Sequence, residues 1–352
     1  MKLRSVEEIL PETKVILKLD LDVPMMEGMV RDNARLSKSI PTIRLLMDKK
    51  CKIVIVGKLG RPTYAKATAG KPDGYDPKLS LRPVYLELMT LLEPNGENMI
   101  ESIFVEDVGN FEKLDMAISK NQIVFLENLR FWKGEENNDS DFLKNLVEIC
   151  QFFVNDALAV SHRRERSNML YKEMPGFYGL AFIEEVNKIM KVVEEKTSPL
   201  TIILGGAKED KLDHIAEILK IADNILIGGK LPLLVNSEQL TVNSGKIKIA
   251  KLREDTFDLS EEDIEEFKKV ISESKMIVWA GAMGWFEKED CKKGTEEIAV
   301  AVAESNAYKI IAGGDTTASI ENLGMKDKID LIASGGGMML ELLTKGKLVA
   351  WE

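Results

Sequence analysis

The segment Tyr308–Leu343 decides the fold. It reads YKIIAGGDTTASIENLG from Tyr308 and, after Met325, KDKIDLIASGGGMMLELL. Both halves repeat one unit: a short apolar run, two or three glycines, and a sequence that is compatible with a helix. This order predicts a strand, a tight turn and a helix N-terminus, twice in succession. Such a turn presents backbone N–H groups and the positive end of a helix dipole to an anion, and glycine lets the anion approach the backbone closely.

The position of Asp315 adds a metal to this interpretation. It directly follows Gly313 and Gly314, so its carboxylate stands where a phosphate would bind. The two anions repel each other unless a divalent cation lies between them, and Mg²⁺ commonly takes one or two carboxylates together with phosphate oxygens. The segment therefore predicts a magnesium-nucleotide site with Asp315 as the metal ligand. Ordinary glycine turns in an α/β sheet are the alternative on these residues alone.

The rest of the chain has the pattern of a two-domain α/β protein. Its 352 residues exceed the length, about 250–300 residues, at which a single core usually splits. Strand-like apolar runs alternate with helical patterns, which predicts mostly parallel sheets that bind ligands beyond the carboxyl ends of their strands. A helix expected over residues 180–197 separates domains 1–175 and 176–352. The expected strands are Lys14–Leu21, Lys52–Val56, Ser102–Val105, Gln122–Leu126, Gln151–Val154, Thr201–Leu204, Asn224–Ile227, Met276–Trp279, Lys309–Ala312 and Asp330–Ala333.

Arginine and glycine are distributed unequally along the chain. Every arginine except Arg253 precedes Ser167, whereas 17 of the 25 glycines follow it. Arginine grips phosphate and carboxylate groups with two hydrogen bonds, and glycine turns hold phosphate with the backbone. The two halves are therefore expected to hold different anionic ligands by different means. A chance scatter of surface arginines is the alternative.

Composition and motif searches exclude several classes of protein. A formal net charge of −10 argues against nucleic acid or an anionic membrane surface as the main partner. The start of the chain lacks the apolar core of a signal peptide, and no apolar run approaches the ~20 residues of a membrane span. The three cysteines show no metal-binding spacing, the P-loop and GxGxxG motifs are absent, and the two histidines are too few for a zinc hydrolase. Phosphoryl transfer, by contrast, needs no histidine and remains possible. Without a signal peptide or a membrane span, the sequence predicts a cytoplasmic protein.

A series of motifs, taken together, resembles the phosphoglycerate kinase family nearly from end to end. They are LDLDVP (Leu19–Pro24), RDNARL (Arg31–Leu36), KLGRP (Lys58–Pro62), LENLRF (Leu126–Phe131), VNDA with SHRRERS (Val154–Ser167), LGGAK (Leu204–Lys208), WAGAMGWFE (Trp279–Glu287), AGGDT and SGGG. The resemblance implies two Rossmann-like domains with mostly parallel sheets, joined by a helical hinge that closes. It also implies reversible phosphoryl transfer between 1,3-bisphosphoglycerate and ADP, giving 3-phosphoglycerate and ATP, with Mg²⁺ as the cofactor. We expect a monomer that acts on these small molecules.

The resemblance assigns roles to residues by their place in these motifs. The residues that would line the glycerate site are Asp20, Asp22, Arg35, Lys58, Arg61, Arg130 and Arg163. Arg35 and Lys208 would face the transferring phosphoryl group, together with the backbone of Gly335, Gly336 and Gly337. Gly313, Gly314, Asp315 and Thr316 would hold the nucleotide phosphates, with Mg²⁺ on Asp315. Lys211 would be a second nucleotide lysine, and Glu287 would bind the ribose.

Several positions differ from the family pattern. Asp22 and Ala280 replace asparagines, and Lys58 and Glu165 replace histidines. One residue is missing after LGGAK, and the region from Gly229 to Met276 is short. We expect the charge of Lys58 to offset that of Asp22. An active kinase is the first hypothesis. The divergent nucleoside region favours a non-catalytic sensor or scaffold as an alternative, and Asp22 with Lys58 motivates a transferase that uses another acyl phosphate or donor.

Overall fold

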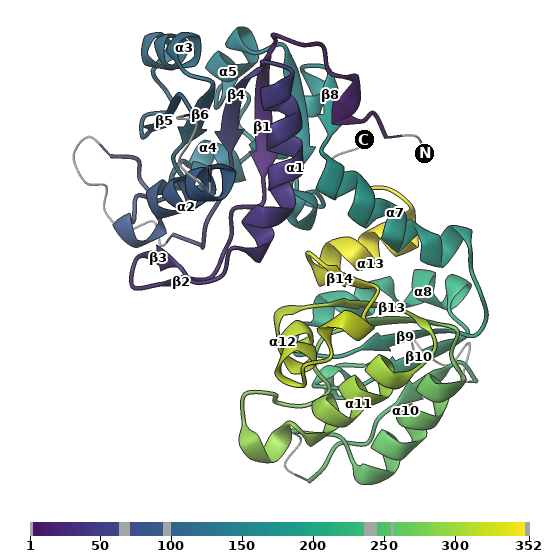
Figure 1. Ribbon diagram of the computed structural model, residues 1–352. Helices are drawn as coiled ribbons and strands as arrows, with labels where there is room; N and C mark the ends of the chain where they lie inside the picture. The colour runs from purple at the N-terminus through teal and green to yellow at the C-terminus, as the bar shows by residue number, and fades with distance from the viewer. Residues whose placement is uncertain (1–2, 63–70, 94–99, 236–244, 255–256, 349–352) are drawn as a thin grey trace. The chain divides into compact units, whose positions relative to one another are not determined.

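A computed structural model of the chain describes residues 3–62, 71–93, 100–235, 245–254 and 257–348. The chain forms two compact units, an N-terminal unit up to Glu184 and a C-terminal unit from Glu185 to Leu348. The division falls inside one continuous helix, α7 (Leu180–Glu194) (Figure 1). Each unit contains a six-stranded parallel sheet with helices, so the predicted fold class is confirmed. No helix within the described residues has the length and apolar character of a membrane span.

The N-terminal unit is built on a sheet with the strand order β5-β6-β4-β1-β7-β8. Its strands are β1 (Lys14–Leu19), β4 (Lys52–Val56), β5 (Ser102–Val105), β6 (Ile123–Leu126), β7 (Phe152–Asp156) and β8 (Gly176–Tyr178). A separate antiparallel hairpin pairs β2 (Met25–Met26) with β3 (Met29–Val30). The main helices are α1 (Ala34–Asp48), α2 (Arg82–Leu92), α3 (Phe111–Lys120) and α5 (Lys144–Ile149), and the short helices are α4 (Lys133–Glu136) and α6 (Arg166–Met169).

Alternation along the central strand divides the core of this unit into two layers. Val15 and Leu17 of β1 pack with residues of α1 and α2, whereas Ile16 packs with residues of α3 and α5. Successive side chains of a strand point to opposite faces, so a sheet that is covered on both faces needs an uninterrupted apolar run. The run VIL in β1 meets this requirement and makes β1 a central strand.

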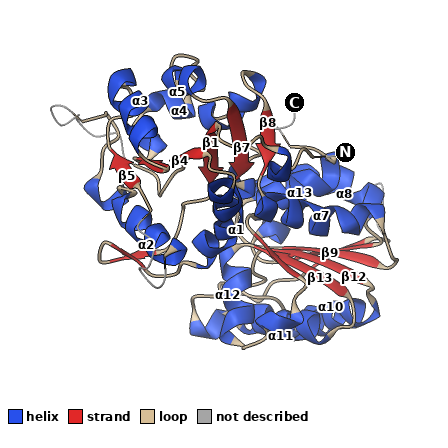
Figure 2. Ribbon diagram, turned by 45° about the horizontal axis from the view of Figure 1, so that its top comes forward, coloured by secondary structure: helices blue, strands red, loops and turns tan. Residues whose placement is uncertain are grey.

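The C-terminal unit has the strand order β11-β10-β9-β12-β13-β14. Counted within this unit, the order is 3-2-1-4-5-6, that of a dinucleotide-binding Rossmann sheet. Figure 2 shows α10, α11 and α12 along one face of this sheet and α8 and α13 along the other. The strands are β9 (Leu200–Leu204), β10 (Asn224–Ile227), β11 (Ile247–Ile249), β12 (Met276–Ala280), β13 (Tyr308–Ala312) and β14 (Leu331–Ala333). The helices are α8 (Ile215–Ile221), α10 (Glu261–Glu273), α11 (Lys293–Glu304), α12 (Gly314–Asn322) and α13 (Gly336–Lys345).

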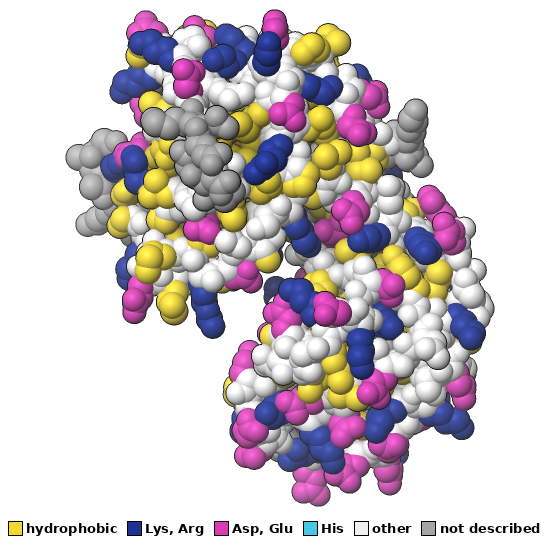
Figure 3. Space-filling view, viewed as in Figure 1, with side chains coloured by type: hydrophobic (Ala, Val, Ile, Leu, Met, Phe, Trp, Pro, Cys, Tyr) yellow, Lys and Arg dark blue, Asp and Glu magenta, His cyan; other side chains and the backbone are white. Residues whose placement is uncertain are grey.

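The surface of this unit is a mixture of charges. Figure 3 shows acidic and basic side chains interspersed on its visible face. Many of them form ion pairs, such as Lys268 with Glu297 at 3.0 Å and Lys293 with Glu261 at 2.7 Å. Exposed pairs of this kind add little to stability but keep the surface free of a single-sign patch.

Sequence patterns located the long strands and missed the short ones. Each of the ten expected strands corresponds to an observed strand, with ends that coincide or differ by at most two residues. The strands β8 and β11 and the hairpin β2–β3 were not expected, because two or three residues do not establish a periodic pattern. The predicted loop Gly60–Tyr75 lies partly outside the described residues, which omit 63–70.

Strand register places glycine at the end of three neighbouring strands in the C-terminal unit. Leu204 pairs with Ala280, and Ala280 pairs with Ala312. The next residues are Gly205, Gly281 and Gly313, which therefore form a row along the edge where a parallel sheet binds its ligands. Gly281 has φ +101°, and a Cβ there would lie 2.3 Å from Lys211 Nζ and 2.4 Å from Gly205 O. Both constraints require glycine.

We therefore expect Gly281→Ala to lower the free energy of unfolding of this unit by roughly 1–3 kcal/mol. The measurement is urea unfolding followed by the fluorescence of Trp279, which is fully buried in the C-terminal core. Gly245→Ala is the matched control, because a Cβ at Gly245 would meet nothing within 4 Å. Equal midpoints for the two variants would show that the close approach at Gly281 is not needed.

Candidate active site

The residues predicted to line the glycerate site gather at one edge of the N-terminal sheet. Lys18 pairs with Val56, Leu19 with Asp156, and Ile55 with Phe125, so the segments that follow β1, β4, β6 and β7 leave the sheet side by side. These segments contain Asp20, Asp22, Lys58, Arg61, Arg130 and Arg163. Arg35 comes from the first turn of α1. The register alone therefore brings together groups that are as far as 143 residues apart in the chain.

Arg35 is held by Asp20. Its Nη1 lies 3.1 Å from one carboxylate oxygen of Asp20 and 3.0 Å from the other. Burial raises the pKa of Asp20, and the Arg35 guanidinium opposes that rise. The Arg35 side chain remains 37% exposed, whereas Asp20 is almost fully enclosed. The pair thus fixes the direction of a guanidinium that keeps an open side.

Asn128, from the LENLRF motif, organises the loops around Arg130. Its side chain accepts hydrogen bonds from the N–H groups of Leu59 and Arg130, both at 3.2 Å. It donates to Leu59 O at 2.7 Å and to Leu79 O at 3.0 Å. An amide that is fully buried and satisfied in this way fixes the loops after β4 and β6 relative to each other. Motif comparison assigned a role to Arg130 alone and missed this neighbour.

The peptide groups of Gly60 are held from two sides. Asp22 accepts a hydrogen bond from Gly60 N at 2.9 Å, and the Arg130 guanidinium donates to Gly60 O. Gly60 has φ +58°, and a Cβ there would lie 2.5 Å from the Leu79 side chain. Arg61, the next residue, is exposed. Asp22 therefore has a local structural task, although it adds a negative charge to this edge.

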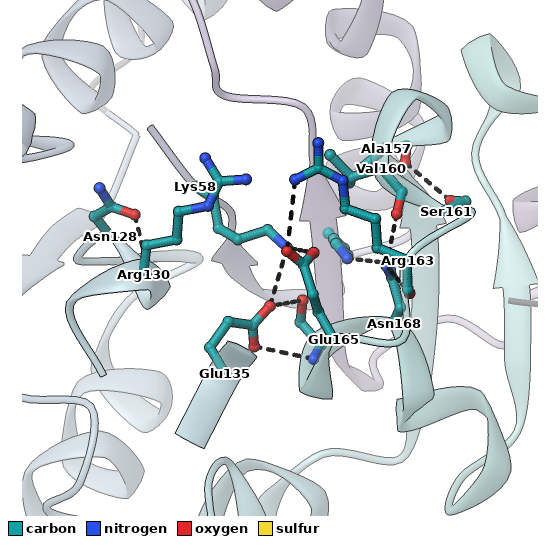
Figure 4. Close-up of polar contacts among 12 residues, drawn as sticks. Lys58, Asn128, Arg130, Glu135, Ala157, Val160, Ser161, Arg163, Glu165 and Asn168 are labelled. Atoms are coloured by element: carbon teal, nitrogen blue, oxygen red, sulfur yellow. Dashed lines mark hydrogen bonds and ion pairs between the residues drawn. The ribbon is translucent and has the colours of Figure 1, made fainter. Parts of the chain in front are cut away.

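Lys58 has other partners than the one that the sequence suggested. Its side chain is 4% exposed, and its ammonium lies 3.1 Å from Glu135 and in contact with Glu165 (Figure 4). Arg163 Nη1 lies 3.7 Å from the other oxygen of Glu165. Burial alone would raise the pKa of Glu165, but Lys58, Lys18 and Arg163 hold it below its ordinary value. The charge of Lys58 is thus balanced by two glutamates rather than by Asp22.

Two further buried residues of this cluster were missed. Lys18, on β1, donates to the side chain of Asn168, and burial lowers its pKa well below the ordinary value. Asn168 in turn donates to Val160 O at 2.7 Å and to Arg163 O at 2.8 Å. Its contacts therefore hold the loop that presents Arg163. The sequence contained one sign of this cluster: Lys18 stands within an apolar strand, and a buried lysine needs a buried partner.

In the C-terminal unit, Lys211 and Thr316 support the row of glycines. The Lys211 ammonium donates to Gly205 O at 2.6 Å and to Ala280 O at 3.0 Å. The buried hydroxyl of Thr316 accepts from Gly281 N at 3.0 Å. Both side chains therefore tie the ends of neighbouring strands together. Lys208, by contrast, is exposed.

A cavity of about 240 Å³ lies beside the first turn of α12, where Asp315 lines it. Gly313 stands at the N-terminus of α12, and the exposed Asp315 lies in the first turn of this helix. Asp315 and Glu287, which are 28 positions apart, both line the cavity. Its other walls include Gly206, Gly229, Phe257 and Trp285, and the last two rings pack edge to face at 5.3 Å. The cavity thus has polar groups, aromatic rings and exposed backbone within one unit.

The triple glycine begins α13 above the same edge. A Cβ on Gly336 would lie 3.8 Å from Ala312 Cβ and 4.0 Å from Ala280 Cβ, so this turn stands over the ends of β12 and β13. Gly337 follows it and is exposed. The carboxylate of Glu185, in α7, accepts a hydrogen bond from Ser334 N at 2.7 Å and so fixes the start of this turn.

The chain thus consists of two parallel α/β units, one with guanidinium groups and the other with glycine turns at the edge where such sheets bind ligands. The sequence model of the family "Phosphoglycerate kinase" matches residues 6–247 and 233–347. The phosphoglycerate kinase of Finegoldia magna is 32% identical over 99% of this chain and 98% of its own length. That of Dictyoglomus turgidum is 31% identical over 96% and 94%. The chain belongs to the phosphoglycerate kinase family.

Solved structures agree with this assignment. The phosphoglycerate kinase structure from Pyrococcus horikoshii OT3 superposes with a TM-score of 0.80 at 25% identity, over 99% of this chain and 98% of that one. The structure from Coxiella burnetii gives a TM-score of 0.76, also at 25% identity, over 99% and 97%. The relatives are therefore matched over nearly their whole lengths.

We expect Lys211→Met to destabilise the C-terminal unit by roughly 1.5–3 kcal/mol, because two carbonyls lose a charged donor. Burial lowers the pKa of Lys211. The folded state therefore binds fewer protons than the unfolded state, and the stability of the parent relative to the variant should rise as pH increases towards the ordinary lysine pKa. Urea midpoints at several pH values measure this difference. Lys220→Met, at an exposed lysine, is the control. A difference that is constant with pH would contradict the expectation.

Proposed function

We propose that the chain catalyses reversible phosphoryl transfer between 1,3-bisphosphoglycerate and ADP, giving 3-phosphoglycerate and ATP. Family membership supports this activity, and the single observation that favours it most is the pairing of two unlike anion-binding edges. The N-terminal edge contains Arg35 and Arg163, which are 37% and 34% exposed, and the buried Arg130. Guanidinium groups suit a ligand with a carboxylate and a phosphate. The C-terminal edge presents glycine turns and a cavity that suit a nucleotide. A non-catalytic sensor would not require both.

In this proposal the residues have distinct tasks. The oxygen of the terminal phosphate of ADP attacks the phosphorus of the acyl phosphate, and the carboxylate of 3-phosphoglycerate leaves. Arg35 and Lys208, with the N–H groups of Gly336 and Gly337, neutralise charge on the equatorial oxygens of the phosphoryl group. Glu287 binds the ribose, and Phe257 with Trp285 forms an apolar wall for the base. Closure of the units about α7 belongs to the proposal, as do a monomeric state and a cytoplasmic location.

The residues around Asp315 fit a magnesium ion that arrives with the nucleotide. Its carboxylate is exposed, lines the cavity and stands beside the Gly313 turn. Within the residues that the structure describes, no group of three or more His, Cys, Asp or Glu side chains could hold a metal by itself. One carboxylate together with nucleotide phosphates matches the usual surroundings of Mg²⁺. The ion would neutralise phosphate charge, while Asp315 would fix its place.

A coupled assay tests the activity. The chain is incubated with ATP, Mg²⁺ and 3-phosphoglycerate, the product is trapped by glyceraldehyde-phosphate dehydrogenase, and the loss of NADH is followed. We expect turnover that depends on 3-phosphoglycerate, and no turnover when acetate replaces it. Calorimetric binding of both ligands without turnover would overturn the proposal in favour of a sensor. The alternative hypothesis of a transferase for another acyl phosphate was based on Lys58 and Asp22. Both residues have structural partners, so they no longer favour that hypothesis.

Arg130→Ala should weaken binding of 3-phosphoglycerate by roughly ten- to a hundredfold, the effect of losing a charge-assisted contact. Binding of ADP should stay within about twofold, because no charge at the C-terminal edge has changed. Calorimetric titrations with each ligand measure the two affinities. Arg82→Ala, at an exposed arginine that is paired with Glu106 in the same unit, is the control. Equal losses for both ligands in a folded variant would contradict the division into two sites.

The effect of Asp315→Asn should depend on the metal. With Mg²⁺, ADP affinity and turnover should both fall, because the metal loses its protein ligand. With EDTA, the variant should bind ADP as well as the parent or slightly better, because a carboxylate no longer repels the phosphates. An Asp315 that only capped α12 would tolerate asparagine in both buffers. Glu321→Gln, at an exposed carboxylate of the same helix, is the control. Identical affinities of parent and variant in both buffers would remove the metal from this site.

A further inference from the structure

The buried cluster of Lys58, Glu135 and Glu165 has a function of its own. We propose that Glu165 is a positioning residue for Arg163, and that Lys58 is the buried counter-ion of Glu165 rather than a ligand of the glycerate. The catalytic consequence rests on the proposed function, whereas the pairing itself does not. The contacts of each member of the cluster lead to this assignment.

The ammonium of Lys58 is committed to protein groups. It can donate three hydrogen bonds, and two go to Glu135 and Glu165. Its side chain is only 4% exposed, so little of it can reach a ligand in solution. The Arg163 side chain beside this pair is 34% exposed, whereas Arg130 is itself buried and its guanidinium donates to Gly60 O. Arg163 is therefore far more accessible to an anion than Lys58, which lies buried beside it.

Glu135 and Glu165 have different tasks, although both bind Lys58. Glu135 is fully buried, and its oxygens also accept from Ser167 N at 3.0 Å and Ser167 Oγ at 2.6 Å. Glu135 therefore fixes the start of α6 through Ser167. Glu165 has one oxygen on Lys58 and turns the other towards Arg163 Nη1 at 3.7 Å. Glu165 is therefore the member of the cluster that connects the buried lysine to an arginine at the ligand edge.

The backbone at Arg163 is already fixed, so the carboxylate controls the side chain. Arg163 N donates to Val160 O at 3.1 Å, and Arg163 O accepts from Asn168 at 2.8 Å. The Arg163 side chain is 34% exposed and has many rotamers open to it. An adjacent carboxylate reduces this freedom before the ligand arrives, which favours binding. Without Lys58, however, the same carboxylate would be an uncompensated negative charge beside an anion.

This arrangement makes the effects of the two residues interdependent. Glu165→Gln removes the guide for Arg163 and should raise the KM for 3-phosphoglycerate by about twofold to fivefold, as expected for a partly exposed ion pair. Lys58→Met leaves the carboxylate unbalanced and should raise this KM by at least about tenfold. The double variant Lys58→Met/Glu165→Gln should have a lower KM than Lys58→Met alone, although the buried Glu135 has lost its ammonium partner in both. The KM for ADP should not change in any of them.

The pH dependence separates positioning from a general loss of structure. In Lys58→Met, only Lys18 and Arg163 still oppose the effect of burial, so the pKa of Glu165 should rise. Lowering the pH from about 8 towards about 5 should then protonate Glu165 and recover much of the lost affinity. Lys58→Arg, which keeps the charge, should stay near the parent. Glu173→Gln is the matched control, because Glu173 pairs with the buried Arg166 and not with Lys58.

The experiment is a double-mutant cycle on the full chain, with steady-state kinetics for each substrate and urea unfolding for each variant. Non-additive KM values for 3-phosphoglycerate and pH rescue of Lys58→Met support the proposal. Additive effects, or a double variant as weak as Lys58→Met at every pH, would make Lys58 a ligand and overturn it. If the parent shows no turnover, the proposed function fails, but the unfolding free energies of the four proteins still test the ion pair. Coupling between Lys58 and Glu165 in these free energies supports the pair, and strict additivity overturns it.

Discussion

The pairing of parallel strands is the constraint on which the sites of this protein depend. In the C-terminal sheet, Leu204, Ala280 and Ala312 are register partners, so the glycine after each of them falls in one row. A slip of one residue would turn every side chain of a strand to the opposite face, and buried faces on both sides forbid it. The apolar core therefore fixes the register, and the register fixes where the polar turns begin.

The two units solve one problem with different chemistry. A chain with a net charge of −10 has to present a positive potential to anionic ligands. The N-terminal unit does so with long cationic side chains, and each of them is held: Arg35 by Asp20, Arg130 by Gly60 O, and Arg163 by Glu165. Holding them reduces the entropy that is lost on binding. The C-terminal unit uses backbone N–H groups at glycine turns, which are fixed by the fold itself.

Features that neighbouring residues determine could be predicted from the sequence, whereas contacts between residues far apart in the chain could not. Strands such as Asn224–Ile227 and the boundary helix follow from local apolar periodicity, and the motifs identified the segments that meet at each edge. The partners of Lys58 could not be predicted, because Glu135 and Glu165 lie 77 and 107 residues away, and only tertiary packing brings them together. The roles of Asn128 and Asn168 could not be predicted for the same reason, because no sequence pattern marks an asparagine that will be buried.

Departures from a family pattern are best interpreted in pairs once their contacts are known. Considered alone, Lys58 adds a positive charge to the N-terminal edge, and Glu165 adds a negative one. The structure shows that the two form a buried ion pair, in which Lys58 also pairs with Glu135. A buried charge is unfavourable unless it is paired, and each of these two side chains supplies an opposite charge to the other. Together they add no net charge to this edge and leave Arg163 exposed beside them. The two changes therefore do not signal a lost activity, which a separate count of substitutions would suggest.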